Sequence, residues 1–228
     1  MAQHLRQIAA LALIVLGVSA TASEEMAGCL DTPDHLAPPV SILASYDFMF
    51  DYQVAVRKVL LTGESDRPYF RVVSLPAFFA EWSLTIEQPA AGEARVEVAQ
   101  ARKQVYTGKG YRAPGVEKFV TRIDAPTAEA LRAVLEKMLL ETRSCETLGG
   151  LGGFDGVTYS FSGFILLRGV LAGETWSPHE STRAGQLVAA ITLLYRIARD
   201  EPDAQLAQRQ QFVDIVNALK AEVVGKAN

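Results

Sequence analysis

The sequence predicts an α+β domain in which an antiparallel sheet carries helices packed on one face and the chain ends in a helical hairpin. Segments rich in β-branched and aromatic residues are grouped together between residues 70 and 171, whereas a doubly wound sheet requires strands that alternate with helices. Residues 157–162 alternate apolar and hydroxyl side chains, which is the period of a half-buried strand. Beyond residue 177, apolar residues recur at helical spacing nearly to the end of the chain.

The N-terminal residues predict export. One formal charge, Arg6, precedes an almost continuous apolar run over residues 8–20 and an A-x-A sequence that ends at Ala22. This is the pattern of a cleavable signal peptide, so residues 1–22 are expected to be removed and the mature chain to begin near Ser23, in the periplasm or outside the cell. The apolar run is too short to span a bilayer, and we therefore expect no transmembrane anchor.

The mature chain is expected to form one domain. Residues 23–40 contain three prolines, at positions 33, 38 and 39, and predict an extended N-terminal segment. Residues 41–228 are long enough for one substantial core and show no internal repeat, so they are assigned to a single α+β domain.

The first helix is expected over residues 45–61. Tyr52, Ala55 and Val59 share one helical face there, and Gly63 ends the pattern. β-rich segments separated by proline and glycine follow, and they predict an antiparallel meander. These strand candidates are 70–75, 82–87, 95–101, 104–106 and 116–123.

The second half of the chain begins with a helix after Asp124, which buries Leu131, Leu135 and Met138 on one face and ends near Cys145. A glycine-rich loop over 148–156 separates this helix from a β-hairpin. The first strand of the hairpin starts at residue 157, and residues 164–171 are expected to form its return strand.

Two helices are expected to close the fold. Ser177, Pro178 and Glu180 provide a cap hydroxyl, a proline at the first helical position and the glutamate of a capping box, so a helix is predicted from here to about Arg199. A last helix is predicted over residues 202–224.

Cys29 and Cys145 are the only cysteines. An even pair in an exported chain favours a Cys29–Cys145 disulfide, which would pin the N-terminal segment against a helix end. A redox-active pair is the alternative, although there is no C-x-x-C motif. The residues before Cys29 also resemble a lipoprotein box, which would make Cys29 a lipidated N-terminus, but two glutamates separate that box from the apolar run.

Charge and histidine content argue against several function classes. The net charge is −4 and becomes more negative when Arg6 leaves with the signal, which excludes a general nucleic-acid binder. Only His35 and His179 remain in the mature chain, without HExxH spacing, so neither a metal site nor a cofactor is expected.

His179 is the candidate catalytic base, because a helix start lowers the pKa of an imidazole and Glu174 and Asp155 are possible partners. The alternative is that His179 is an exposed residue of a first helical turn, and we prefer it. The glycines at 149–156 could cradle an anion, but a strand follows them in place of the helix that phosphate loops require. They are therefore interpreted as a surface loop.

The candidate binding residues are Lys109, Tyr111 and Arg112, in a stretch where basic residues interleave with tyrosines. This pattern is typical of a solvated hairpin, and the alternative is a contact patch for an acidic protein partner or an anionic envelope polymer. Trp82 and Trp176 are both expected in the core.

Three short stretches, 75–82, 155–161 and 173–178, together resemble a pattern in an uncharacterised family of exported bacterial proteins. They read LPAFFAEW, DGVTYSF and GETWSP. This resemblance implies export and no known activity.

The sequence as a whole favours a non-catalytic periplasmic binding or protein-interaction domain of the inhibitor or immunity type, whose partner is a periplasmic protein. One alternative is a periplasmic hydrolase that uses His179 with a nearby carboxylate. A further alternative is an envelope assembly or structural factor, which would fractionate with the membrane.

Overall fold

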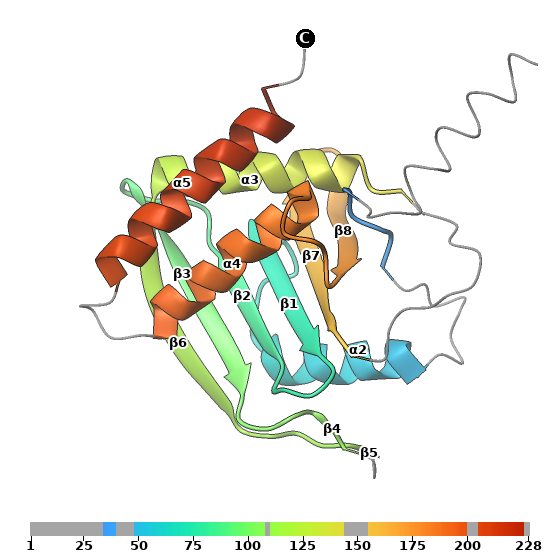
Figure 1. Cartoon of the computed structure of the whole chain (residues 1–228). Coiled ribbons are helices and arrows are strands. Elements are labelled where there is room, and N and C mark those ends of the chain that lie inside the picture. The colour runs from blue at the N-terminus through green and yellow to red at the C-terminus, as the bar shows by residue number, and fades with distance from the viewer. Residues whose placement is uncertain (1–33, 40–47, 108–109, 144–154, 200–204, 226–228) are drawn as a thin grey trace, which may run out of the picture.

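The protein is described by a computed structural model that covers residues 34–39, 48–107, 110–143, 155–199 and 205–225 (Figure 1). Within these residues it is an α+β structure built on one six-stranded antiparallel sheet, which confirms the predicted fold class. The strands are β1 (Phe70–Pro76), β2 (Trp82–Ile86), β3 (Glu93–Ala101), β6 (Val116–Asp124), β7 (Val157–Ile165) and β8 (Gly169–Trp176).

The strand order is β6-β3-β2-β1-β7-β8, so β1 lies near the centre and β6 and β8 lie at the edges. Consecutive strands pair as hairpins except for two: β6 returns to pair with β3, and β7 joins β1 after a helix. A separate two-stranded hairpin, β4 (Tyr106–Thr107) with β5 (Gly110–Tyr111), projects between β3 and β6. The predicted meander is therefore a sheet with a small accessory hairpin.

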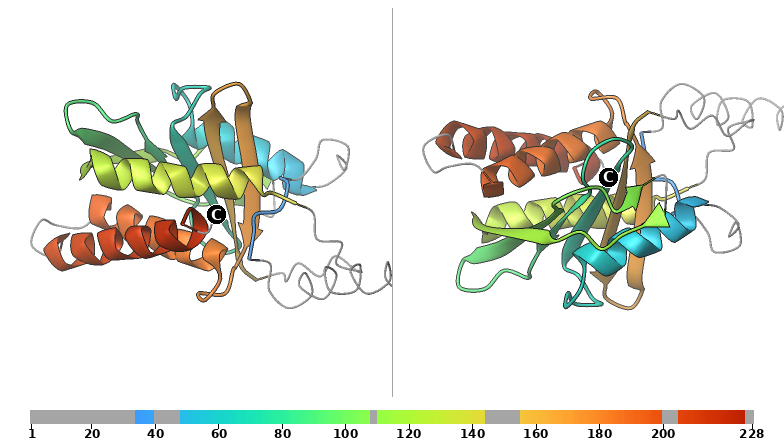
Figure 2. Two further views of the ribbon diagram at one scale, coloured as in Figure 1. Left: turned by 90° about the horizontal axis from the view of Figure 1, so that it is seen from above. Right: turned by 90° about the horizontal axis from the view of Figure 1, so that it is seen from below.

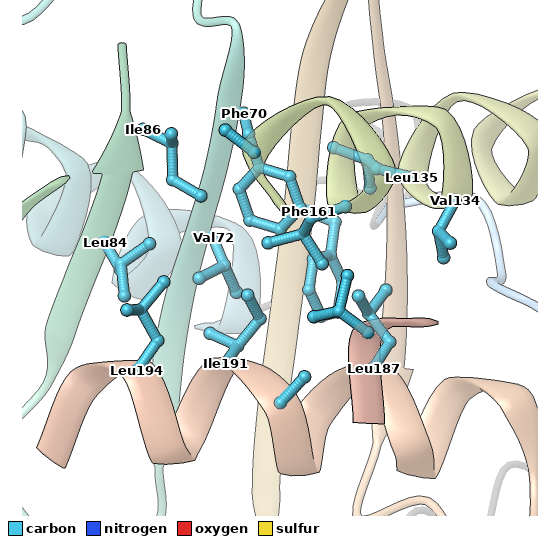
Figure 3. Close-up of a cluster of buried hydrophobic side chains, with 14 of the residues drawn as sticks. Phe70, Val72, Leu84, Ile86, Val134, Leu135, Phe161, Leu187, Ile191 and Leu194 are labelled. Carbon is cyan, nitrogen blue, oxygen red and sulfur yellow. The ribbon is translucent and has the colours of Figure 1, made fainter. Parts of the chain in front are cut away.

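One face of the sheet is covered by α3 (Ala125–Leu140), α4 (Arg183–Arg199) and α5 (Gln205–Val223). Helices α4 and α5 pack against each other as the predicted C-terminal hairpin (Figure 2). Side chains of alternate strand residues meet the apolar stripes of these helices, and they form the large core shown in Figure 3. Its fully buried members include Phe70, Phe161, Leu135, Leu187 and Ile191.

The opposite face carries a single helix, α2 (Phe48–Leu60), which lies on the side away from α4 and α5 (Figure 2). Its buried residues Tyr52, Val56 and Leu60 recur every fourth position, as one helix face requires. They pack on the alternate residues of β1 and β3, including Val73 and Ala99, in a second and smaller apolar cluster.

The N-terminal residues 34–39 run beside the edge strand β8. Ala37 exchanges two backbone hydrogen bonds with Glu174, of 2.8 and 2.7 Å, and Leu36 is fully buried in the large core. Gly173 makes room for this contact, because a Cβ there would lie 2.9 Å from that of Leu36. Asp34 binds the backbone N–H and the side chain of Arg183, the latter at 2.7 Å. We call residues 34–37 the strap.

Two predicted boundaries were wrong. Helix α4 begins at Arg183 and not at Ser177, because Thr182 is its cap: the Thr182 hydroxyl accepts from the Gly185 N–H at 3.0 Å. The return strand of the last hairpin is Gly169–Trp176 and not 164–171, since β7 continues to Ile165 and the turn follows it. By contrast, α3 starts at Ala125 after Asp124, whose carboxylate accepts from Thr127 N at 2.8 Å.

Candidate functional site

Helix α2 presents a second apolar stripe beside its buried one. Val54, Ala55 and Val59 are half-buried, and Asp51 and Lys58 flank them on the same side of the helix. These positions are spaced by three or four residues, so they form one continuous strip along α2. Ala55 and Val59 also pack against the smaller apolar cluster, and all three residues stay partly exposed, so the strip is the edge of that cluster and a surface that another group can contact.

The β4–β5 hairpin lies opposite this strip and is held by its base. Arg112 N donates to Val105 O at 2.8 Å, and the Arg112 side chain donates from Nε to Gln104 O at 2.7 Å. Tyr106 and Tyr111 pair across the hairpin with ring centroids 5.6 Å apart. These contacts place the Tyr111 ring and the Arg112 guanidinium toward α2.

A groove of about 470 Å³ lies between α2 and the hairpin. Its lining is aliphatic along α2, and Tyr111, Arg112 and Ala113 close it on the hairpin side. Among the residues that the structure describes, neither Lys58 nor Arg112 has a carboxylate within ion-pair distance. The groove thus offers an aliphatic floor, two cations that form no ion pair with a described carboxylate, and one acid, Asp51, in its lining.

The pKa of Tyr111 is affected by its neighbours in this groove. Its pKa is raised above the usual 10.0, first by burial, then by the nearby charge of Asp51 and by Tyr106. A tyrosine phenol is protonated at neutral pH even at its usual pKa, so Tyr111 is a hydrogen-bond donor in the groove. Two of the three predicted binding residues, Tyr111 and Arg112, line the groove, and the third, Lys109, lies outside the described residues.

A fully buried carboxylate ties the groove to the sheet. Glu81 accepts from the Tyr52 hydroxyl at 2.7 Å and from Val105 N at 2.9 and 3.1 Å. Burial raises the pKa of Tyr52 strongly, and the hydrogen bond to Glu81 and its negative charge add to the effect. Glu81 thus links α2, the β1–β2 loop and the base of the hairpin, so the two walls of the groove share one anchor.

Two further polar contacts hold α2 to the other half of the sheet. Gln53 Nε2 donates to Glu174 Oε1 at 3.0 Å, and Arg57 Nη2 donates to Ser160 Oγ at 2.9 Å. Glu174 is therefore a buried residue under α2. The side chain proposed as a catalytic partner binds the helix that forms one wall of the groove.

His179 and Asp155 lie elsewhere. His179 is exposed in the loop before α4, where its Nδ1 is 2.8 Å from Ser181 Oγ. The argument that His179 occupies a helix start was wrong, because α4 begins four residues later. Asp155 is exposed beside the start of β7, and within the described residues no hydrogen bond joins it to His179 or to Glu174.

Other predicted features fall outside the described residues. Cys29 and Cys145 are both among them, and so is most of the glycine-rich loop, residues 149–154. In the ranges that are described, no group of three or more His, Cys, Asp or Glu residues gathers in a way that could bind a metal ion. None of the described helices is long and apolar enough to cross a membrane.

Comparisons with family models, with curated proteins and with solved structures find no significant match.

Sequence reasoning missed three features of this region. The apolar strip of α2 was not recognised because Ala55 and Val59 were placed on one face with Tyr52, whereas the structure leaves them half-buried beside Val54. Glu81 gave a local signal, since a lone carboxylate stood between the apolar residues Phe79 and Trp82. Trp176 was wrongly assigned to the core: it is exposed, whereas Trp82 is buried and stacks on Tyr195 at 4.4 Å.

Proposed function

We propose that this chain is an exported, non-catalytic binding domain that holds a segment of a periplasmic protein partner in the groove between α2 and the β4–β5 hairpin. The observation that carries the proposal is the groove itself, with its aliphatic floor and the cations Lys58 and Arg112 at its walls. An exposed apolar surface rimmed by polar residues is typical of a protein-interaction site.

The chemistry of the lining defines the partner segment. The aliphatic side of α2 suits a short apolar side chain, and Arg112 suits a carboxylate, which a guanidinium can bind with two parallel hydrogen bonds. The Arg112 Nε–H is already used by Gln104 O, so both Nη groups are available to the ligand. The expected ligand is therefore an acidic segment that also carries an aliphatic or aromatic residue.

The two walls of the groove are held in fixed positions by buried hydrogen bonds. Glu81 joins its two walls, and Gln53 and Arg57 fix α2 on the sheet. A rigid, preformed groove loses little conformational entropy when it binds. This is the behaviour expected of an inhibitor or immunity protein that must hold its target tightly.

Export and the disulfide belong to the same proposal. The mature chain would begin near Ser23 in the periplasm, where Cys29 and Cys145 can form a bond. The hydrogen bond from Arg143 N to Leu36 O, 3.2 Å long, supports this pairing because it brings the chain that follows Cys29 beside the chain that precedes Cys145. Intact mass of the protein isolated from periplasm, with and without reduction, tests both the cleavage near Ala22 and the bond.

The binding proposal is tested by affinity capture from periplasmic extract, followed by measurement of Kd for the captured partner. Arg112→Glu is expected to weaken that affinity by about tenfold or more, since a charge reversal replaces attraction by repulsion. The matched control is Arg168→Glu, which makes the same charge change in the exposed β7–β8 turn and is expected to leave the affinity unchanged. Equal affinities of the Arg112→Glu variant and the wild type would refute the role of the groove.

A further inference from the structure

The end of the sheet near the hairpin brings together the three stretches that the sequence singled out. These are the β1–β2 loop, the start of β7 and the end of β8 (Figure 1). Ala77 N donates to Gly156 O at 2.9 Å, and Ser177 N donates to Val157 O at 2.9 Å. The three stretches therefore form one connected surface.

This end carries exposed aromatic side chains. Phe78 and Phe79 in the β1–β2 loop are 66 and 73 % exposed, and Trp176 at the end of β8 is 44 % exposed. The Trp176 ring lies over Gly156, because a Cβ on that glycine would come within 2.6 Å of the ring. Since Gly156 also binds Ala77, the indole stands beside the loop that holds the two phenylalanines.

The hairpin extends the same surface. Gln104 Nε2 donates to Ala77 O at 3.0 Å and so fixes the hairpin base against the β1–β2 loop. Tyr106 and Tyr111 are also exposed. We call the five residues Phe78, Phe79, Tyr106, Tyr111 and Trp176 the aromatic end.

The exposed aromatic side chains are concentrated at this end of the sheet. Among the described residues, every large aromatic side chain that is exposed belongs to the aromatic end. The other exposed large apolar residues are aliphatic, and they include Leu166 and Leu167 in the β7–β8 turn at the opposite end of the sheet. A concentration of this kind differs from the scattered apolar residues that any protein surface shows.

Cations surround the aromatic end. Lys103 and Arg112 are exposed and flank Gln104 in space, and Arg102 is paired with Glu117 at 3.3 Å. Asp155 is the nearest exposed acid along the chain to Gly156. Asp51 lies near Tyr111 as well, but no described carboxylate forms an ion pair with Lys103 or Arg112, so these two exposed cations can attract an anionic surface.

We propose that the aromatic end docks the protein on an anionic lipid bilayer, with Phe78 and Phe79 at the boundary between headgroups and acyl chains. Phenylalanine has no polar group that needs a partner, so its ring can enter this boundary, whereas Trp and Tyr prefer the headgroup level. Lys103 and Arg112 would attract the negative headgroups. Phe78, Phe79 and Trp176 do not line the groove, whereas Tyr111 and Arg112 belong to both surfaces, so the test is made on the phenylalanines.

Lipid fits these observations better than a protein partner does. The phenylalanines stand on a loop beside the end of the sheet, and they line neither the groove beside α2 nor the pocket formed by Glu93, Arg122 and Phe212. Aromatic rings with nearby cations are the combination that peripheral membrane proteins use. Contact with a single apolar loop and a few cations would give weak, reversible binding.

The test is co-sedimentation of the mature chain from Ser23 with vesicles of phosphatidylcholine alone or with about 30 % phosphatidylglycerol. Binding is expected only to the anionic vesicles, and Phe78→Ser/Phe79→Ser is expected to lower the partition coefficient by about tenfold or more. The matched control is Leu166→Ser/Leu167→Ser, which removes two exposed apolar side chains at the opposite end and is expected to bind as the wild type does.

Tryptophan fluorescence gives a second readout. The chain has two tryptophans, of which Trp82 is buried and Trp176 is exposed. A blue shift on addition of anionic vesicles, absent in Trp176→Phe, would place the indole at the lipid. The proposal would be overturned if the wild type sedimented with neither kind of vesicle, or if the Leu166/Leu167 control lost as much binding as the Phe78/Phe79 variant. It would also be overturned if the wild type bound no vesicles and the Phe78/Phe79 variant lost a protein partner.

Discussion

The two faces of the sheet are stabilised in different ways. The face under α3, α4 and α5 is filled almost entirely by apolar side chains, in which Phe70 and Phe161 meet edge to face at 6.4 Å. The face under α2 has a small apolar cluster beside buried polar groups, among them Glu81, Gln53 and Glu174. Hydrophobic burial is non-directional, whereas a buried carboxylate must have its partners at fixed distances.

The two faces therefore contribute differently to the structure: one provides folding free energy, and the other fixes the position of α2. The apolar face provides most of the area removed from water and therefore most of the folding free energy. The polar contacts on the other face fix α2 in one position, because a shift of the helix would break the hydrogen bonds from Tyr52 to Glu81 and from Gln53 to Glu174. The groove is built on this second face, where position matters more than total burial.

The largest loss of stability is expected when a core residue of the apolar face is replaced. Phe161→Ala should lower the free energy of unfolding by about 3–5 kcal/mol, since it removes a fully buried ring and leaves a cavity between α3 and α4. Urea denaturation followed by circular dichroism measures the loss. Val120→Ala, on an exposed position of β6, is the control and should change stability by less than about 0.5 kcal/mol. Equal losses in both variants would contradict the assignment of the core.

A smaller loss of stability is expected when a buried polar residue under α2 is replaced. Glu81→Ala should cost about 2–3 kcal/mol of unfolding free energy, because it removes the buried acceptor of the Tyr52 hydroxyl and of the Val105 N–H. The double variant with Tyr52→Phe should recover part of that loss, and the same denaturation experiment measures it as a coupling energy. If the two losses simply add, the polar contact contributes no specific stability.

A pH-dependent effect is expected at the strap. Burial lowers the pKa of His35 below its usual 6.5, with the charges of Arg143 and Arg183 acting in the same direction and those of Asp34 and the Arg143 backbone opposing them. The stability that neutral His35 provides is therefore present above pH 6.5 and is lost as the pH falls below it. Unfolding curves across that range should show a loss of stability that His35→Gln lacks. Parallel pH profiles for the two proteins would argue against it.

The smallest effect is expected where the polar face is open to water. Lys118 pairs with Glu97 at 2.5 Å, and Arg95 pairs with Glu97 at 2.6 Å. Burial would raise the pKa of Glu97, but the hydrogen bonds from Lys118 and Arg95 outweigh it, so the pKa is lowered. Lys118→Met should cost less than about 1 kcal/mol, and about 1 M salt should erase the difference. A larger loss that survives salt would mean that this surface behaves like the buried one.

Sequence patterns predicted the fold well where one physical signal dominated. The alternation from Val157 predicted β7, and the spacing of Leu131, Leu135 and Met138 predicted α3. The start of α4 was misplaced because Ser177 and Thr182 both offer a cap hydroxyl, and only the tertiary contact of Arg183 with Asp34 favours the second.

The candidate site was less predictable. The sequence indicated Tyr111 and Arg112 through their composition, but it could not indicate α2 as their neighbour, because the two are far apart in the chain. The burial of Glu174 was hidden for a similar reason. Its partner Gln53 is separated from it by 121 residues, and no local sequence pattern indicates a hydrogen bond between residues so far apart in the chain.

The strap has a consequence for the order of folding. Asp34 reaches its partner Arg183 across a separation of 149 residues, so its docking closes one of the longest loops in the chain. The edge of β8 therefore remains uncovered until nearly all of the sequence has been synthesised and α4 has formed. Contacts at such range slow folding.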